Sequence, residues 1–341
     1  MHKILVTGGT GYIGSHTVVE LQNAGYEVVI ADNLSNSSAT VLDSITKITG
    51  KKPFFSQIDV GDEAATRKLF QEYRFDGIIH FAAYKSVGES VEHPLKYYKN
   101  NLSSLINLVQ VATDYQTDNF VFSSSCSVYG EPVKLPVSEL SPVQKAESPY
   151  ANTKQICEEI LSDQSRVSSL KVILLRYFNP VGSHESGLIG ELPIGPPTNL
   201  FPVLTQAAIG KRPQLKVFGN DYPTPDGTCI RDYIHVVDVA KAHVTALHRM
   251  LENKQKKKVE VFNLGTGKGT SVMEVINTFE DLTGVKVNYE LTPRRAGDVA
   301  KVYADTSLAN TELGWKTELG LDEMVRSAWK WEQFLNQTNG K

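Results

Sequence analysis

The sequence predicts an α/β protein with a Rossmann-type, doubly wound parallel sheet and a smaller, interleaved substrate-binding domain. Short apolar runs alternate with helix-like segments through the first half of the chain, at residues 3–7, 27–31, 54–58, 77–81, 119–124 and 171–177. Runs of this kind are typical of strands that are buried on both faces of a parallel sheet. A glycine-rich turn after the first run and a Tyr-x-x-x-Lys pattern further on then indicate a dinucleotide-dependent enzyme.

The first strand is expected at Lys3–Thr7, and the turn that follows it is rich in glycine. Gly8, Gly11 and Gly14 lie between this strand and an amphipathic helix. Glycine lets the backbone approach a pyrophosphate, and it lets the helix pack closely on the strand. A glycine triplet alone is only a weak indication of a dinucleotide site.

Asp32 strengthens this interpretation. It ends the second strand, Glu27–Ala31, and lies about 20 residues after Gly14, where a carboxylate binds the adenosine ribose hydroxyls. The same carboxylate would repel a 2′-phosphate, and no arginine directly follows it. NAD is therefore the expected cofactor, in preference to NADP.

Tyr150 and Lys154 are the pair expected to move protons. A phenol titrates near pH 10, so the pKa of Tyr150 must fall to about 7 before the side chain acts as a base near neutrality. Ser148 is the expected N-cap and Pro149 the first helical residue, so Tyr150 lies where the helix dipole favours a phenolate. Lys154 follows on the same helical face, and an oxidised nicotinamide would add further positive charge. The alternative is a Tyr and a Lys that only pack on a helix surface.

The second half of the chain has a different texture. Proline and glycine are frequent from Pro180 to Gly227, without regular alternation, which predicts a loop-rich cap. A helix-like run at 236–250 and a strand-like run at 259–263 then indicate a return to the sheet. We therefore expect an NAD-binding domain of residues 1–178 with 234–263, and a substrate-binding domain of residues 179–233 with 264–341.

Composition excludes several other classes of protein. The 341 residues carry a net charge of −3, and the dense basic run at 254–258 is expected to be a solvated loop, so we expect no nucleic-acid partner. No signal peptide and no apolar run of about 18 residues are apparent, which predicts a cytoplasmic protein without a membrane partner. The three cysteines and eight histidines lack ligand spacing, so we expect neither a disulfide framework nor a metal.

Several long strings in this sequence resemble the UDP-glucose 4-epimerase family of the extended short-chain dehydrogenases/reductases. The strings are Thr7–His16, Val87–Ser90, Ser123–Ser125, Arg176–Pro180, Phe218–Thr224 and Arg231–His235. They run nearly from end to end, and contiguous matches of this length are highly specific. The resemblance implies a homodimeric enzyme with tightly held NAD that interconverts UDP-glucose and UDP-galactose, and it makes the second domain the binding domain for the nucleotide sugar.

The resemblance also implies roles for single residues, carried over by matching position. Tyr150 would be the base, Lys154 its electrostatic partner, and Ser125 a hydrogen-bonding residue at the sugar hydroxyl. The implied cofactor-binding residues are Gly8, Gly11, Tyr12, Ile13, Gly14, Asp32, Asn33, Asp59, Val60, Phe81, Ala82, Ala83, Lys85, Asn100, Tyr150, Lys154 and Phe178. The implied substrate-binding residues are Ser125, Tyr150, Asn179, Asn199, Leu200, Val217, Phe218, Arg231, Arg295, Asp298 and Val302.

The implied reaction inverts C4 of the hexose through a transient 4-keto sugar. Tyr150 would take the proton of the 4-hydroxyl while NAD takes the hydride, and the ketose would swing before the hydride returns. A rival nucleotide-sugar 4,6-dehydratase needs a further acid and base. Dehydratases of this superfamily carry Asp-Glu after the residue that matches Ser125, whereas this chain has Cys126 and Ser127. A second rival is an NAD-sensing regulator without turnover, which the complete Ser-Tyr-Lys set disfavours.

Five of the implied substrate contacts have a plainer alternative. Ser125 would only cap backbone groups at the end of a strand, and Asn179 would only be a turn residue before Pro180. Arg231 and Arg295 suit a diphosphate, but each would equally suit a salt bridge inside its own domain. Val302 matches a position where the family has a bulky Tyr in enzymes restricted to plain hexoses and a small residue in those that accept N-acetylated ones. It would otherwise only begin a strand, with Tyr303 filling the space. The sequence does not identify the physiological sugar.

Overall fold

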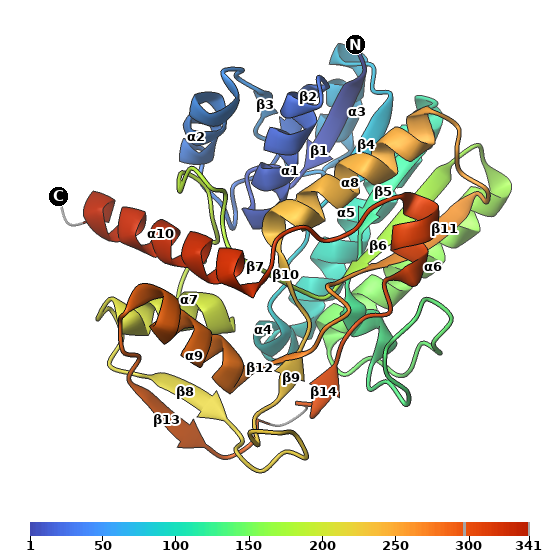
Figure 1. The fold of residues 1–341 in the computed structure, drawn as a ribbon. Coiled ribbons are helices and arrows are strands. Elements are labelled where there is room, and N and C mark those ends of the chain that lie inside the picture. The colour runs from blue at the N-terminus through green and yellow to red at the C-terminus, as the bar shows by residue number, and fades with distance from the viewer. Residues whose placement is uncertain (296–297, 340–341) are drawn as a thin grey trace.

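The computed structural model describes residues 1–295 and 298–339. Its central feature is a seven-stranded sheet of parallel strands in the order β11-β6-β5-β4-β1-β2-β3 (Figure 1). The strands are β1 (Lys3–Thr7), β2 (Glu27–Ala31), β3 (Phe54–Ser56), β4 (Gly77–His80), β5 (Asn119–Ser123), β6 (Lys171–Tyr177) and β11 (Val259–Leu264). The strand order reverses between β1 and β4, the place where open parallel sheets bind ligands. The predicted Rossmann-type fold is confirmed.

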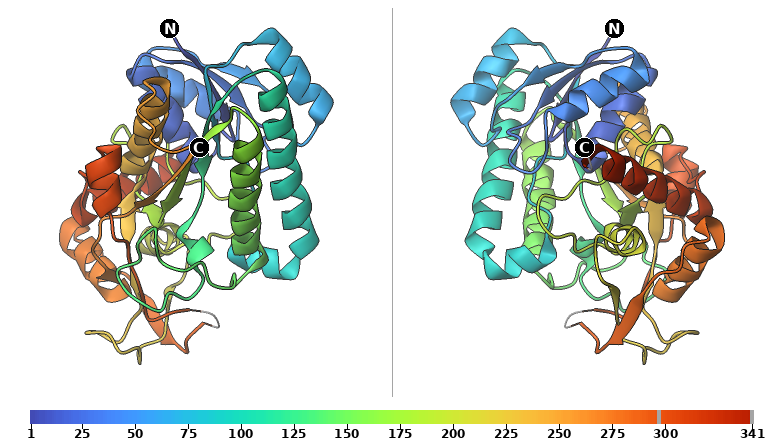
Figure 2. Two further views of the ribbon diagram at one scale, coloured as in Figure 1. Left: turned by 90° about the vertical axis from the view of Figure 1, so that its right-hand side faces the viewer. Right: turned by 90° about the vertical axis from the view of Figure 1, so that its left-hand side faces the viewer.

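Helices cover both faces of this sheet, as the two side views in Figure 2 show. One face carries α1 (Tyr12–Asn23), α2 (Thr40–Thr49) and α8 (Val236–Leu251), and the other carries α3 (Glu63–Glu72), α5 (Pro94–Asp114) and α6 (Pro149–Val167). Alternate strand residues supply the two cores: Ile4 and Val6 of β1 face the first layer, and Leu5 faces the second. Burial on both faces explains why these strands are mostly apolar and do not alternate apolar with polar residues.

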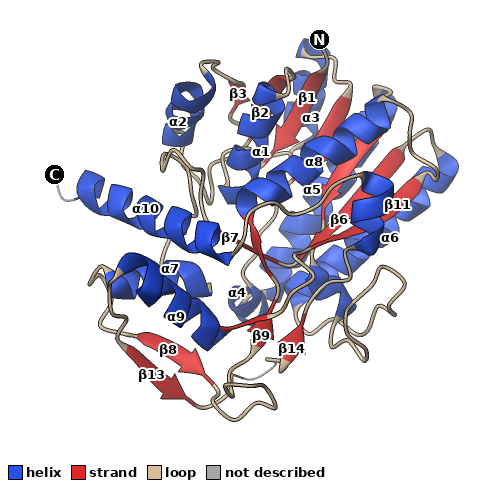
Figure 3. Ribbon diagram, in the orientation of Figure 1, coloured by secondary structure: helices blue, strands red, loops and turns tan. Residues whose placement is uncertain are grey.

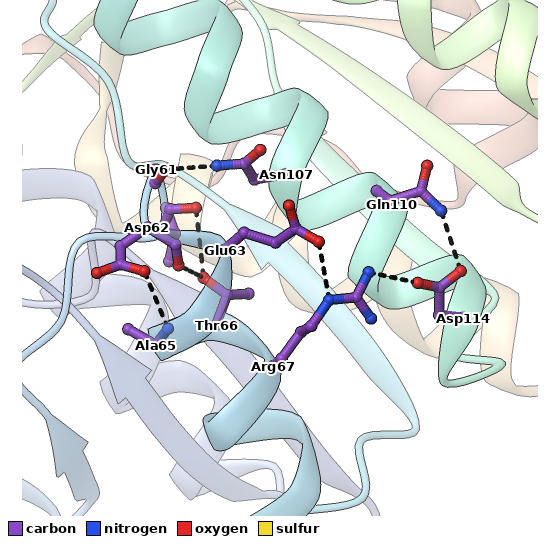
Figure 4. Close-up of polar contacts among 10 residues, drawn as sticks. Gly61, Asp62, Glu63, Ala65, Thr66, Arg67, Asn107, Gln110 and Asp114 are labelled. Carbon is purple, nitrogen blue, oxygen red and sulfur yellow. Dashed lines mark hydrogen bonds and ion pairs between the residues drawn. The ribbon is translucent and has the colours of Figure 1, made fainter.

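The loop after β3 carries Asp59 and is anchored by the second helical layer (Figure 4). Asn107 of α5 donates a hydrogen bond from its Nδ2 to the main-chain oxygen of Gly61. Arg67 links its own helix, α3, to α5, because its Nη2 lies 2.7 Å from Oδ2 of Asp114 in α5. The loop is thereby held at the carboxyl edge of the sheet, where the candidate site lies.

A second region lies beside the carboxyl edge of the large sheet (Figure 3). It contains α7 (Leu200–Ala208), β8 (Leu215–Phe218), α9 (Val272–Thr283), β13 (Tyr289–Thr292) and α10 (Leu321–Asn339). β8 and β13 pair in parallel, and α7, α9 and α10 pack with them around Phe201, Val217 and Phe279. The stretch 180–227, expected to be mostly loop, thus includes a helix and a strand of this core.

The remaining elements are short. They are α4 (Val87–Glu92), the 3-10 helix η1 (Cys126–Tyr129), the π-helix η2 (Ala309–Leu313), and the strands β7 (Asn179–Val181), β9 (Ile230–Arg231), β10 (Tyr233–His235), β12 (Thr270–Ser271) and β14 (Lys301–Val302). β7 pairs with β10, while β12, β9 and β14 form a small sheet. The chain visits the second region, returns through α8 and β11, and then leaves again. Within the described parts of the chain, no helix combines the length and apolar character that a membrane span requires.

Candidate active site

A cavity follows the carboxyl edge of the large sheet at the point where the strand order reverses. Its walls are residues 10–15 with Gly8, residues 31–38 that follow β2, residues 58–60 that follow β3, and residues 81–85 that follow β4. Tyr150 and Lys154 of α6 and the loop 190–194 complete the lining. The cavity therefore joins the glycine-rich turn to the proton-transfer pair.

The glycine-rich turn requires glycine at two positions for different reasons. Gly8 has a φ of +69°, in the left-handed region that L side chains rarely adopt. A Cβ at Gly14 would lie 2.2 Å from the main-chain oxygen of Gly8. This close packing brings the start of α1 to the cavity, and the first N–H groups of a helix have no partner within the helix. The turn therefore presents backbone donors and the positive end of the helix dipole, which fit a pyrophosphate.

Asp32 lies beside this turn at the end of β2 and is 8% exposed. Its Oδ2 accepts a hydrogen bond from the Thr10 N–H at 3.1 Å, and its Oδ1 accepts from the Leu34 N–H at 2.9 Å and the Ser37 hydroxyl at 3.2 Å. These bonds fix the carboxylate at the cavity wall. Its position relative to the turn fits the ribose of NAD.

Sixteen of the seventeen residues predicted to bind the cofactor line this cavity. They are Gly8, Gly11, Tyr12, Ile13, Gly14, Asp32, Asn33, Asp59, Val60, Phe81, Ala82, Ala83, Lys85, Asn100, Tyr150 and Lys154. Phe178 differs: it is 3% exposed and lies in a hydrophobic cluster with Val128, Tyr129, Val137 and Ala304. Tyr177 lines the cavity in its place. Neighbouring residues of an extended segment point to opposite sides, which explains the exchange.

The helix that carries the proton-transfer pair begins as the sequence predicts. The Ser148 hydroxyl accepts the Ala151 N–H at 3.2 Å, and Pro149 is the first residue of α6. Lys154 is 5% exposed, and its Nζ donates to the main-chain oxygen of Ser123 at 2.7 Å. The Ser123 hydroxyl in turn donates to the Tyr177 hydroxyl at 3.0 Å. The end of β5 thus fixes the ammonium group one helical turn from Tyr150.

Burial determines the titration of both members of the pair. It raises the pKa of Tyr150, with a smaller contribution from Tyr177, while a hydrogen bond with Ser125 partly opposes the rise. Burial also lowers the pKa of Lys154 to about 8, against the effect of Cys157 and Glu158. Among the protein groups alone, the helix start and Lys154 therefore do not bring the pKa of Tyr150 below its ordinary value. Desolvation of the phenolate exceeds those attractions. The predicted fall also includes the charge of a bound oxidised nicotinamide, and it stays a prediction.

Ser125 caps a short helix and can also donate a hydrogen bond from its hydroxyl group. It caps η1, with its hydroxyl oxygen accepting the Ser127 N–H at 3.2 Å. The side chain is 8% exposed. Because that bond uses an oxygen lone pair, the hydroxyl hydrogen remains for Tyr150 or for a ligand oxygen. The plainer interpretation of a strand-end cap is thus correct without excluding a contact with substrate.

The predicted UDP contacts lie beyond the cavity, in the second region. Arg231 and Arg295 meet on one carboxylate: Nη2 of Arg231 lies 3.4 Å from Oδ1 of Asp298, and Nη2 of Arg295 lies 2.9 Å from the same oxygen. The Arg295 guanidinium also lies 5.6 Å from the ring centre of Phe218. The salt-bridge alternative is therefore correct for both arginines. Two guanidinium groups on one carboxylate still leave an excess of positive charge, as a diphosphate requires.

The other predicted UDP contacts have varied surroundings. Asn199 donates from Nδ2 to Oε1 of Glu191 at 2.8 Å, and Leu200 begins α7. The Val217 side chain is 1% exposed and belongs to the core of the second region. Asn179 belongs to β7, where its N–H donates to the Asp232 main-chain oxygen at 3.0 Å. Val302 pairs in register with Arg231 and packs against the cluster that contains Phe178.

Sequence reasoning missed several residues of the cavity. Ser35, Asn36, Ser37 and Ser38 form a polar run directly after Asp32, and this run was a usable signal. Tyr177 was also predictable, because it is the last residue of the strand expected at 171–177 and strand ends line this edge of the sheet. Glu191 had no signal, because it lies in an irregular loop and meets Lys85 across a separation of 106 residues.

The cysteines and potential metal ligands are simply described. Cys126, Cys157 and Cys229 are all free thiols. Over residues 1–295 and 298–339, no group of three His, Cys, Asp or Glu side chains has the geometry to hold a metal ion.

Comparisons with known proteins agree with this geometry. A family model described as GDP-mannose 4,6 dehydratase matches residues 5–328. The UDP-glucose 4-epimerase of Neisseria meningitidis serogroup C is 50% identical over 341 residues, which cover 100% of this chain and 99% of that relative. A crystal structure of UDP-glucose-4-epimerase from Stenotrophomonas maltophila with bound NAD and formylated UDP-arabinopyranose is similar with a TM-score of 0.96 at 48% identity, covering 99% and 100% of the two chains. The Bifidobacterium longum enzyme in complex with NAD+ and UDP gives 0.93 at 46% identity, with the same coverage.

Proposed function

Since the chain belongs to the UDP-glucose 4-epimerases of the extended short-chain dehydrogenases/reductases, we propose that Tyr150 carries the proton transfer of its reaction. The protein is an NAD-dependent isomerase that inverts C4 of a UDP-hexose. The observation that carries the assignment to Tyr150 is its place in the first turn of α6, at the wall of the cavity, with Lys154 anchored to Ser123 one turn away.

The residues of the cavity fit NAD. The turn from Gly8 to Gly14 offers backbone donors to the pyrophosphate, and Asp32 offers a fixed carboxylate to the adenosine ribose. Asp59 and Val60 line the wall beyond Asp32. When bound, NAD supplies the acceptor and donor of the C4 hydride.

The protein groups supply the proton transfer. Tyr150 accepts the proton of the sugar 4-hydroxyl, and Ser125 donates a hydrogen bond to the same oxygen. Lys154 holds a positive charge one turn from the phenol, which favours the phenolate through Coulomb attraction. Return of the proton to the oxygen, with the hydride back at C4, restores the hydroxyl, so the overall reaction has no net redox change.

Inversion requires that the keto sugar turns while the UDP stays in place. We assign the fixed end to Arg231 and Arg295, whose planar guanidinium groups suit diphosphate oxygens. They lie in the second region, with Asp298 between them. A sugar held chiefly through its diphosphate is free to present its opposite face to the nicotinamide.

The nucleotide-sugar 4,6-dehydratases are the nearest enzymatic alternative, and the family model carries that description. A dehydratase eliminates water and needs an acid and a base beside the sugar. Cys126 and Ser127 stand at those positions, and burial raises the pKa of the Cys126 thiol to about 12. Neither side chain is suited to proton transfer near neutrality, which favours epimerisation.

The experiment is turnover of UDP-galactose by the purified protein in deuterated water. We expect UDP-glucose without deuterium at C4, because hydrogen that moves as a hydride does not exchange with solvent. Deuterium at C4 would overturn the hydride mechanism. Label at C5 or C6 with loss of water would identify a dehydratase, and NAD binding without turnover would identify the sensing regulator.

We further propose a homodimer formed through α4 and α5. Val87 and Val91 of α4 are 53% and 61% exposed, and Leu95 and Ile106 of α5 are 80% and 49% exposed. Apolar side chains gathered on two adjacent helices suit an isologous helix-to-helix interface. Light scattering should give twice the chain mass, and Leu95→Lys with Ile106→Lys should give the monomer mass. A monomeric unmodified protein would contradict the proposal.

Three further proposals concern which domain binds which ligand, where the protein is located in the cell, and which sugars it accepts. We propose that residues 1–178 with 234–263 bind NAD, and that residues 179–233 with 264–341 bind the nucleotide sugar. Residues 296, 297, 340 and 341 lie outside the described part of the chain. We propose a cytoplasmic location, where free thiols remain reduced.

We also propose that Val302 admits N-acetylated hexoses. The position of Tyr303 supports this proposal. Its Cδ1 would lie 3.4 Å from a Cβ added at Gly269. Adjacent residues of an extended chain point in opposite directions, so the Tyr303 ring points away from the side of Val302.

A further inference from the structure

Glu191 joins the two ligand sites through one carboxylate oxygen. Its Oε1 accepts a hydrogen bond from Nζ of Lys85 at 3.0 Å and another from Nδ2 of Asn199 at 2.8 Å. Lys85 follows β4 and lines the cofactor cavity, whereas Asn199 stands directly before α7 in the second region. These three side chains form a continuous polar link between the two sites.

The position of Glu191 is built by α10. A Cβ at Gly190 would lie 2.5 Å from the Trp331 ring, so the indole packs directly under the backbone of this loop. The Trp331 Nε1–H then donates to the main-chain oxygen of Glu191 at 2.9 Å. This clamp acts on the backbone alone. The Glu191 side chain, 10% exposed, is left to bind Lys85 and Asn199.

Lys85 gains the most from this contact. Its side chain is half exposed, and its Nζ lies 5.6 Å from the ring centre of Tyr12, another residue of the cavity wall. A flexible lysine loses considerable conformational entropy when a ligand immobilises it. Contact with Glu191 removes part of that entropy before the ligand arrives, and preorganisation of this kind increases affinity. Asn199 is ordered by the same oxygen.

We propose that Glu191 is a positioning residue that couples the two sites, so that filling one increases the affinity of the other. The inference rests on the proposed function, because it takes Lys85 as a cofactor group and Asn199 as a UDP group. A ligand at either site orders the shared oxygen together with the partner across it. The second ligand then meets a site that is already ordered, and linkage requires equal effects in both directions.

The experiment measures the dissociation constant of NAD by equilibrium dialysis, with and without saturating UDP. We expect UDP to tighten NAD at least fivefold in the unmodified protein, within the usual range of coupling between sites. In Glu191→Ala the effect should fall to less than twofold, and NAD alone should bind about tenfold more weakly. Glu191→Gln keeps an acceptor but loses the charge, so its coupling should lie between these values.

The matched control is Glu185→Gln, an exposed acid of the same segment whose main-chain oxygen, not its carboxylate, binds Lys330. It should retain full coupling. All variants should keep the melting temperature of the unmodified protein within about 2 °C, because an ion pair with a half-exposed lysine contributes little to folding. If Glu191→Ala fails to fold, Glu191→Gln carries the test.

Unchanged coupling in the Glu191 variants, or no coupling in the unmodified protein, would overturn the inference. Failure of the proposed function is a separate result. It would appear as absent turnover of UDP-galactose, while the dialysis measurement requires no turnover.

Discussion

At the scale of the residue, Tyr150 stands in surroundings that oppose its own chemistry. Burial raises the pKa of the phenol and lowers the pKa of Lys154 to about 8. At pH 7 the lysine therefore still carries its proton, whereas the phenol is neutral in the protein alone. A hydrogen bond with Ser125 partly opposes the rise in the pKa of Tyr150. Formation of the phenolate therefore depends on the positive charge that a bound oxidised nicotinamide would add.

Removal of the Tyr150 hydroxyl tests its assignment directly. Tyr150→Phe should lower kcat by about 10²-fold or more, since general acid–base catalysis is typically worth 10² to 10⁴. NAD and UDP should bind nearly as before, because the ring still fills the wall. The measurement is kcat together with the dissociation constants of both ligands, with Tyr289→Phe, a half-exposed tyrosine of β13, as the control. Retention of more than half the activity would show that another group is the base.

Val302 concerns the range of sugars rather than the rate. It packs on the cluster of Val128, Tyr129 and Phe178, and it stands beside Arg231 in the small sheet. We expect the unmodified protein to epimerise UDP-N-acetylglucosamine as well as UDP-glucose. Val302→Tyr should suppress the first activity and spare the second, because a phenol would occupy the space of the acetamido group. Turnover of both substrates in one preparation checks this, and an unmodified protein that turns over only UDP-galactose and UDP-glucose contradicts it.

At the scale of the element, the turn between β1 and α1 depends on contact between backbones. In Gly14→Ala, the new methyl group would overlap the main-chain oxygen of Gly8, 2.2 Å from its Cβ. Overpacking of this kind typically destabilises a protein by about 1 to 3 kcal/mol, and we expect purified Gly14→Ala to lose its NAD as well. Urea unfolding and the absorbance of released nucleotide measure the two effects.

Gly88 supplies the matched control for that prediction. It lies in α4, and a Cβ there would meet nothing within 4 Å. Gly88→Ala should leave NAD binding intact and stabilise the protein by up to about 1 kcal/mol, because alanine loses less backbone entropy in a helix. Equal effects of the two substitutions would contradict the role given to the turn.

The sequence predicted elements well where one local pattern decides the structure. β1, β2 and β6 begin and end at the predicted residues, because burial on both faces gives each strand a continuous apolar run. The third strand ends at Ser56 instead of Ile58, and α7 and β8 arise in a stretch expected to be loop. Their apolar side chains pack against α9 and α10 from far along the chain, a pairing that no short window contains.

The same distinction applies to the candidate site. The cofactor cavity was predicted almost completely, because strand ends and one turn supply it. Phe178 does not line the cavity, whereas its neighbour Tyr177 does, since a pattern does not fix the face of a residue just beyond a strand. The shared carboxylate of Asp298 and the pairing of Glu191 with Lys85 depend on tertiary packing, so the sequence offered no sign of them.

At the scale of the whole molecule, four histidines are buried as neutral groups. Burial lowers the pKa of His16 and His80 to about 3, and that of His235 and His243 to about 4. His16 and His243 each place Nδ1 within 2.8 Å of a main-chain oxygen four residues earlier. Their Nε2 atoms find no hydrogen-bond partner among the residues that the structure describes. A proton there would create a buried charge without a partner.

Acid should therefore weaken the fold at a pH where its carboxylates are still ionised. Unfolded histidines take up protons near pH 6.5, while these folded ones stay neutral down to about 4 or 3, so the unfolded chain binds more protons in that range. Stability is fully present above pH 6.5 and is lost as the pH falls below it. His243→Asn should reduce the loss between pH 7 and pH 5 by about 1 to 2 kcal/mol, measured by urea unfolding. The exposed His93→Asn should not, and an equal change in both would contradict the assignment.

The strand order of the large sheet also affects how the chain emerges from the ribosome. β6 lies between β5 and β11, yet β11 follows it only after residues 178–258 have been synthesised. During that interval β6 is an edge strand whose residues Val172–Leu175 are all buried in the finished protein. An unpaired apolar edge is a template for wrong pairing, and contacts distant in sequence close slowly. A nascent chain that stalls before Val259 is thus an aggregation hazard, and slow translation across that interval should lower the yield of native protein.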